Sequence, residues 1–219
     1  MPTAFAAALL ASITALAAPA RADTLVIRGA AIVDVQRGAI IRDRDIRIED
    51  GRITALILAG APAEGQVIDA TGLFAMPGLF DAHVHLMASM DTDPKLLIAH
   101  GVTSARDLGA PTQPILDLKK SIASGGSGGT LGPDLVVTGA IIDGDPPMWP
   151  FSEIAADADA GRAAVRKLHD AGVDMIKVYS RLTKDAYLAV VDEAHKHNLK
   201  VTGHIPESVT LSEAIAAGQ

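Results

Sequence analysis

The stretch MPGLFDAHVHL, residues 76–86, decides how the chain is interpreted, because its apolar run ends in two histidines one residue apart. On a β-strand, alternate residues point to the same face, so His83 and His85 converge while Val84 points the other way. That arrangement suits two imidazoles on one metal ion. Two histidines that only pack within a sheet are the alternative at this point.

Two later strands carry polar residues where an apolar residue is expected. Lys177 lies within DMIKVY, and the alternation along that strand puts it on the opposite face from Ile176 and Val178. A lysine buried in a sheet is unfavourable unless it is paired, modified or bound; an outward-pointing edge residue is the alternative. His204 ends the strand KVTGHI, at the end where α/β barrels build their active sites. We therefore expect a convergent set of nitrogen ligands made of His83, His85, Lys177 and His204.

His195 and His197 have the same spacing but a different setting. They fall on a predicted helix that Thr183 caps and that runs through Lys196, where two positions lie about 200° apart around the axis. This second pair therefore cannot share a ligand.

Strands and helices are arranged differently on the two sides of Pro77. From Thr24 to Ala75 the chain shows short strands, with a hairpin turn at Asp50-Gly51, and predicts the N-terminal part of a small β-sandwich-like domain at residues 23–75. Residues 76–219 then show five strand-helix units, typical of a parallel sheet covered by helices. We expect an α/β fold in which this part is a partial (β/α)8 TIM barrel, with a doubly wound sheet as the alternative. A full barrel needs eight units and about 250 residues, so the chain stops part-way round.

Three helix starts can be recognised from their polar caps. A capping box, in which Thr and Glu three residues apart bind each other's backbone N–H, predicts the start of the last helix. The predicted starts are Asp93 with Pro94 at the first helical position, Thr183, and Thr210 with Glu213.

Composition favours small-molecule chemistry in an exported protein. The 219 residues carry a net charge of -7 and no Lys/Arg cluster, which argues against nucleic acid as a partner, and the absence of cysteine excludes disulfides and thiolate catalysis. Residues 1–22 are apolar and rich in alanine, and end in Ala-Arg-Ala, typical of a cleaved secretory signal. We expect a periplasmic or secreted protein that leaves the membrane after signal cleavage. An uncleaved anchor or an ordinary buried helix is the alternative for this segment.

With these residues in view, the sequence resembles the amidohydrolase superfamily, in particular its exported members that are similar to imidazolonepropionases and to prolidase-type or Xaa-Arg dipeptidases. The resemblance covers residues 24–219 and rests on four segments: MPGLFDAHVHL, GVTSARDLG, DMIKVYS and VTGHIPESVTLSEAIAAGQ.

The resemblance implies a two-metal site. By it, His83 and His85 bind the more buried ion, His204 binds the second, and Lys177 bridges both after CO2 converts its amine into a carboxylated side chain. Zinc is the implied metal. Such a family member hydrolyses C–N bonds in amides, peptides or cyclic amides through a metal-bridging hydroxide. The substrate would be a small molecule or dipeptide-like, with Tyr179 as a substrate contact.

The sequence departs from the family pattern at its end. The family takes a further metal histidine from barrel strand 6 and a metal-binding aspartate, the general base, from strand 8, and the chain ends at Gln219 before either. No catalytic residue can be assigned, so we expect an N-terminal fragment that is inactive alone. Two alternatives are a mononuclear deaminase or imidazolone hydrolase that uses the histidines alone, and a non-catalytic exported binding protein on the same fold. Substrate, metal identity and oligomeric state stay open.

Overall fold

A computed structural model describes residues 24–125 and 129–219, and the predicted signal at residues 1–22 lies outside this part. The chain divides into two compact units, residues 1–77 and residues 78–219. Within the described part, no helix is both long and apolar enough to span a membrane.

The first unit is built of two small sheets. One has the strand order β5-β4-β1-β6 and the other β3-β2-β7; β1 pairs antiparallel with β4 and parallel with β6. The strands are β1 (Thr24–Arg28), β2 (Ala31–Asp34), β3 (Ala39–Ile41), β4 (Arg44–Glu49), β5 (Arg52–Leu58), β6 (Gln66–Asp69) and β7 (Phe74–Ala75).

The apolar run TLVIRGAAIVD, residues 24–34, predicts one strand, but a buried carboxylate divides it into β1 and β2. Asp45 is fully buried and accepts the backbone N–H groups of Gly29 and Gly60, at 3.1 and 3.0 Å. Gly29 has a φ of 77°, a left-handed conformation that ends β1 and redirects the chain into β2. The apolar run 24–34 therefore serves two different sheets, which its composition alone does not indicate.

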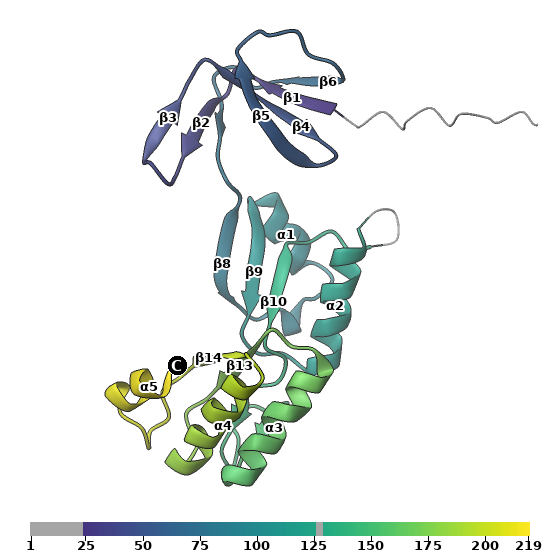
Figure 1. Ribbon diagram of the computed structural model, residues 1–219. Helices are drawn as coiled ribbons and strands as arrows, with labels where there is room; N and C mark the ends of the chain where they lie inside the picture. The colour runs from purple at the N-terminus through teal and green to yellow at the C-terminus, as the bar shows by residue number, and fades with distance from the viewer. Residues whose placement is uncertain (1–23, 126–128) are drawn as a thin grey trace, which may run out of the picture. The chain divides into compact units, whose positions relative to one another are not determined.

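The second unit alternates strands with helices (Figure 1). Its strands are β8 (Leu79–Val84), β9 (Val102–Asp107), β10 (Asp134–Val137), β11 (Ile142–Asp143), β12 (Glu153–Ile154), β13 (Met175–Val178) and β14 (Lys200–Gly203). Its helices are the 3-10 turn η1 (Leu86–Ala88), α1 (Asp93–Ala99), α2 (Thr112–Ser124), α3 (Ala158–Ala171), α4 (Lys184–Lys196) and α5 (Leu211–Ala217).

All strand pairs of the second unit are parallel. One sheet has the order β10-β9-β8 and the other β12-β11-β13-β14. A backbone hydrogen bond links the two sheets, since the N–H of Asp174, which directly precedes β13, donates to the carbonyl of Val137 in β10. The predicted α/β fold with a parallel sheet and helical crossovers is confirmed.

The apolar run DLVVTGAII, residues 134–142, predicts a single strand, and this prediction is wrong because the run separates into β10 and β11. Gly139 adopts a left-handed φ of 64°, and the N–H of Ala140 bonds the Thr112 hydroxyl at 3.1 Å instead of a neighbouring strand. The helix α2 thus supplies the hydrogen-bond partner that interrupts the ladder.

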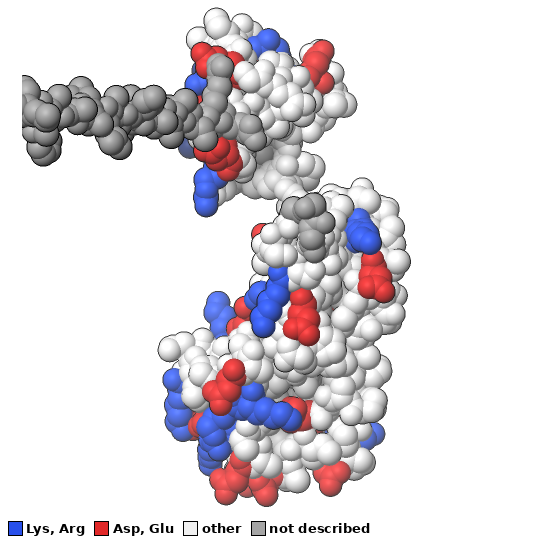
Figure 2. Space-filling view, turned by 90° about the vertical axis from the view of Figure 1, so that its right-hand side faces the viewer, with Lys and Arg blue, Asp and Glu red and all other residues white. Residues whose placement is uncertain are grey.

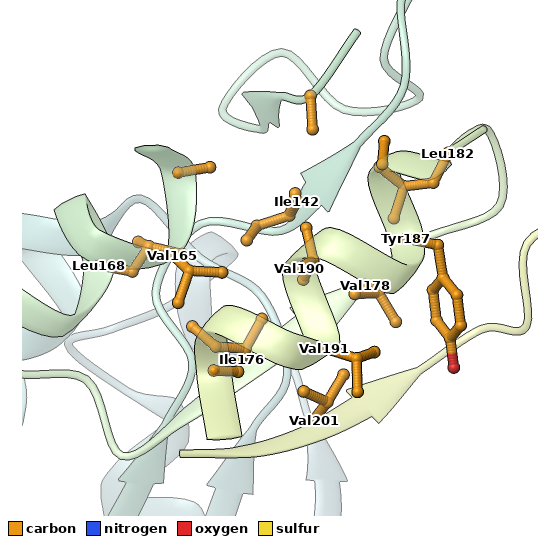
Figure 3. Packing of buried hydrophobic residues seen from close by; sticks show 14 of the residues in the cluster. Ile142, Val165, Leu168, Ile176, Val178, Leu182, Tyr187, Val190, Val191 and Val201 are labelled. Carbon is orange, nitrogen blue, oxygen red and sulfur yellow. The ribbon is translucent and has the colours of Figure 1, made fainter. Parts of the chain in front are cut away.

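The core of the second unit lies between its strands and helices (Figure 3). Ile176 and Val178 of β13 are fully buried with Val165 and Leu168 of α3 and with Val190 of α4. These side chains point to the helix layer, so the other residues of β13 point to the opposite face. Lysines, arginines and acidic residues are interspersed on the face of this unit seen in Figure 2, with no broad area of one sign.

The helix starts agree with the sequence at two of three positions. Thr183 accepts the N–H of Ala186, and Thr210 forms the complete capping box with Glu213. At α1 the cap position is Thr92, so Asp93 is the first helical residue and not the predicted cap.

Acid should weaken the attachment of α5. The hydrogen bond from Lys184 and then those from Thr210 lower the pKa of Glu213 to about 2 from its ordinary 4.5. The ionised form therefore stabilises the folded chain fully above pH 4.5, and this contribution is lost as the pH falls toward about 2. We expect Glu213→Gln to be less stable than the native chain at neutral pH, and the difference to disappear near pH 2 in urea unfolding. Glu207→Gln, at an exposed carboxylate with no ion pair in the described structure, is the control; an unchanged difference at low pH would contradict the expectation.

Candidate functional site

Four predicted site residues come from three parallel strands of the second unit. His83 lies in β8 and His85 directly follows it, Lys177 lies in β13, and His204 directly follows β14. Parallel strands place their carboxyl ends at one edge, which is where barrels of this kind carry their chemistry. The edge, and not any single strand, is therefore the candidate site.

The two histidines of β8 converge as their spacing predicts. The Nε2 atoms of His83 and His85 lie 3.2 Å apart, with ring centroids 5.1 Å apart and planes at 64°. Two tetrahedral ligands about 2.0–2.1 Å from a zinc ion would lie about 3.3 Å apart. The pair therefore has the separation of two nitrogen ligands of one ion.

A backbone carbonyl fixes which nitrogen of His85 is free. Its Nδ1 lies 3.1 Å from the carbonyl oxygen of Gly109, which can only accept, so Nδ1 carries the proton. The Nε2 atom that faces His83 then has an available lone pair. Metal-binding histidines are oriented by this kind of second hydrogen bond.

Lys177 is buried on the face of β13 opposite the hydrophobic core. Its side chain is 2% exposed, whereas its strand neighbours Ile176 and Val178 pack against the helices. No acidic partner contacts its ammonium in the described part of the chain, and the Tyr179 ring centroid lies 6.0 Å from Nζ. The alternative of an outward-pointing edge residue therefore does not hold, and the buried amine needs a partner or a chemical change.

His204 packs on the tyrosine that follows β13. The rings of Tyr179 and His204 are stacked with centroids 4.1 Å apart, and the His204 Nδ1 lies 3.2 Å from the Ser180 hydroxyl. Backbone pairing contributes as well, because His204 N–H donates to the Val178 carbonyl at 3.2 Å. Because Nδ1 contacts Ser180, Nε2 is the nitrogen of His204 that remains to bind a metal.

The basic side chains of the site lower one another's pKa values. Burial, and next the charge of Lys177, lower the pKa of His83 and the pKa of His204. Burial, and next Arg106, lower the pKa of Lys177. The side chains thus lie within electrostatic reach of each other and favour neutral nitrogens, the form in which imidazole binds a metal.

Carboxylates and histidines alone do not complete a metal site here. Within residues 24–125 and 129–219, no three His, Cys, Asp or Glu side chains are grouped so as to hold an ion.

The other histidine pair is separated, as the helical spacing predicts. His197 directly follows α4 and its ring is tilted by 36° against that of His169, with ring centroids 4.2 Å apart, while His195 faces Gly218. The two rings therefore do not converge on a common ligand position.

Two buried aspartates that sequence reasoning left without a role support the edge. Asp107 ends β9 and accepts the N–H of Leu86 at 2.7 Å and that of Gly109 at 3.1 Å. Burial raises the pKa of Asp107 although these two bonds act against it. Because Leu86 follows His85 and Gly109 binds its ring, this carboxylate fixes the backbone on both sides of that histidine.

Asp143 holds the neighbouring part of the edge. It ends β11, is fully buried, and accepts the N–H of Gly144 at 2.9 Å and that of Arg181 at 2.8 Å through Oδ1. Burial, and next Lys177, lower the pKa of His204, and the negative charge of Asp143 opposes this shift. An acidic residue at the carboxyl end of a strand was the signal that could have found both aspartates.

The amidohydrolase family model matches residues 74–219, about two thirds of the chain. Among curated proteins, an adenine deaminase of Paracoccus denitrificans is 38% identical over 105 residues, which are 45% of this chain and 17% of that protein. An adenine deaminase of Moorella thermoacetica is 44% identical over 73 residues, covering 32% and 12%. The aligned parts are thus small shares of these relatives.

Solved structures share the fold over most of the chain. A candidate prolidase from Bifidobacterium longum superposes with a TM-score of 0.71 at 27% identity, covering 85% of this chain and 50% of the other. A Xaa-Pro dipeptidase structure with bound methionine gives 0.71 at 21% identity, covering 89% and 60%, and supports the fold alone. The chain therefore spans about half the length of these neighbours, and the predicted partial barrel is confirmed.

Removal of the Asp107 carboxylate should destabilise the edge around His85. Asp107→Ala leaves two buried N–H groups unsatisfied, and each such group costs about 1–3 kcal/mol. We expect the free energy of unfolding to fall by about 2–4 kcal/mol in urea titrations. Asp117→Ala, which removes only an exposed contact with Gln113, should lower it by at most about 0.5 kcal/mol. Equal losses in the two variants would contradict this role of Asp107.

Proposed function

This chain belongs to the amidohydrolase family, and on that premise we propose that it carries the metal site of a hydrolase acting on C–N bonds of amides, peptides or cyclic amides. The observation that carries the proposal is the meeting of two histidine Nε2 atoms at 3.2 Å on the edge to which a buried, unpaired Lys177 belongs.

The proposed ligands are His83, His85, Lys177 and His204, and they hold two divalent ions, which we propose are zinc. The donor set fits such ions, since imidazole and a carboxylate-type oxygen both suit zinc. A neutral amine adds CO2 with loss of a proton, and the lowered pKa of Lys177 favours that neutral form. Carboxylation would turn an unpaired buried cation into an anionic ligand, which removes the conflict with burial.

When bound, such ions lower the pKa of water toward neutrality and polarise a carbonyl oxygen. Neighbouring residues of the chain orient the rings of the proposed histidine ligands. The Gly109 carbonyl holds His85 in one tautomer, and Ser180 and Tyr179 hold the ring of His204. Tyr179 is only half-buried beside His204, which supports its proposed contact with substrate. We assign the general base to no residue of the described chain, and we propose that this chain alone is inactive.

A deaminase is the second candidate function. It is favoured by the similarity to proteins named adenine deaminase, which reaches 38% identity over 105 residues. In this alternative the histidines hold a single ion and Lys177 is not a ligand. The number of ions bound separates the two candidates.

The number of zinc ions per chain should depend on Lys177. With bicarbonate present, we expect about two ions per chain by elemental analysis after dialysis, as in other two-metal sites. Lys177→Ala removes the shared ligand and should reduce this to one ion or fewer. The exposed Lys95→Ala variant is the matched control and should bind as the native chain does.

The other results are equally informative. One ion per chain in both the native protein and Lys177→Ala would favour the single-ion deaminase. No bound ion in the native chain would contradict a metal site at this edge.

We also propose export to the periplasm or the cell exterior through residues 1–22, on the strength of their sequence alone. N-terminal sequencing of the protein from an expressing cell should find a mature chain that begins at Asp23. A protein that retains Met1 in the cytoplasm would contradict export.

A further inference from the structure

We propose that Met148 and Trp149, on the loop that follows β11, form an apolar wall that contacts an apolar or aromatic group of the amide substrate beside His204. The inference rests on the proposed function and deepens it, because it assigns a substrate class to a site whose substrate is otherwise open. It is carried by the way this loop is attached to the candidate site.

One buried carboxylate anchors the loop at two points. Asp143 Oδ1 accepts the N–H of Gly144 at the base of the loop, and Oδ2 accepts the N–H of Met148 at 2.9 Å. The same Oδ1 accepts the N–H of Arg181, which follows β13. The position of Met148 is therefore fixed relative to the segment that carries Tyr179 and Ser180.

Further contacts press the loop against that segment. The Arg181 guanidinium donates from Nη1 to the Pro146 carbonyl at 2.9 Å. A Cβ atom on Gly144 would lie 1.9 Å from the Arg181 carbonyl oxygen, so a side chain there would displace one of the two segments. Ser180, the residue before Arg181, contacts the His204 ring. The loop and His204 therefore both contact the segment Ser180-Arg181 that follows β13.

Two large apolar side chains stay exposed on this fixed loop. Met148 is 48% exposed and Trp149 is 42% exposed. Trp149 stacks on Phe151 with ring centroids 6.2 Å apart, which restricts its orientation. A single exposed apolar residue needs no explanation. Two adjacent ones on an anchored loop at the carboxyl edge of the strands are placed as substrate-binding residues are.

The chemistry of the wall selects the ligand. A thioether and an indole offer polarisable apolar surface, which favours an aromatic or large aliphatic group over a methyl group. The guanidinium of Arg181 already donates to the Pro146 carbonyl. We therefore expect a substrate whose amide adjoins a bulky apolar side chain.

The single tryptophan of the chain gives a direct readout. The zinc- and bicarbonate-treated chain is titrated with N-acetylphenylalaninamide and with N-acetylalaninamide, followed by tryptophan fluorescence and by equilibrium dialysis. We expect the aromatic probe to bind about tenfold more tightly and to change the emission of Trp149, because an aromatic ring buries more apolar surface than a methyl group.

Three variants test the wall. Trp149→Ala should reduce the ratio of the two affinities to near one in dialysis, while zinc binding stays unchanged. Asp143→Asn, which replaces the acceptor of the Met148 N–H by a donor, should lower the ratio without removing either apolar side chain. Leu131→Ala is the control, since Leu131 is 61% exposed on the loop before β10, at the opposite edge of the strands; it should keep the native ratio.

Failure of this inference can be distinguished from failure of the proposed function. Three results obtained with zinc bound would overturn the apolar wall and leave the metal site standing. They are equal affinities for the two probes, no binding of either probe, and a ratio of affinities that persists in Trp149→Ala. Loss of the ratio in Leu131→Ala as strongly as in Trp149→Ala would also overturn it. Absence of bound zinc in the native chain would contradict the proposed function, and the inference with it.

Discussion

The parallel pairing of β13 with β14 is the constraint on which the candidate site depends. Its register places Lys177 opposite Thr202 and Val178 opposite Gly203. The next residues after the two strands are Tyr179 and His204, which belong to the candidate site. Because Ile176 and Val178 must face the helices, Lys177 must face the other side. Burial of apolar side chains on one face thus forces an amine into a buried position on the other.

Buried carboxylates transmit this order to the loops at the edge. Asp107 and Asp143 are both fully buried, and each accepts a backbone N–H group from a segment distant in sequence. A buried carboxylate is stable only when its oxygens are satisfied, so each one fixes the loops that satisfy it. The candidate ligands are therefore oriented by neighbours that are not themselves candidates for the metal.

Local patterns failed where a distant segment supplied the hydrogen-bond partner. The run 24–34 became two strands because Asp45 binds the N–H of Gly29, and DLVVTGAII was interrupted because Thr112 binds the N–H of Ala140. In both, the apolar composition was correctly associated with strands. The local sequence did not indicate either break, because the residue that accepts the hydrogen bond lies 16 residues away in the first case and 28 in the second.

The sequence by itself determined the alternation of strands and helices, the convergence of His83 and His85, the face of Lys177 and the caps of α4 and α5. Each of these depends on residues within a few positions of one another, where the periods of strand and helix fix direction. Only the tertiary structure decided the tautomer of His85, whose acceptor Gly109 is 24 residues distant, and the burial of Asp107 and Asp143. Those features depend on which strand ends meet at the edge, and local periodicity does not encode that meeting.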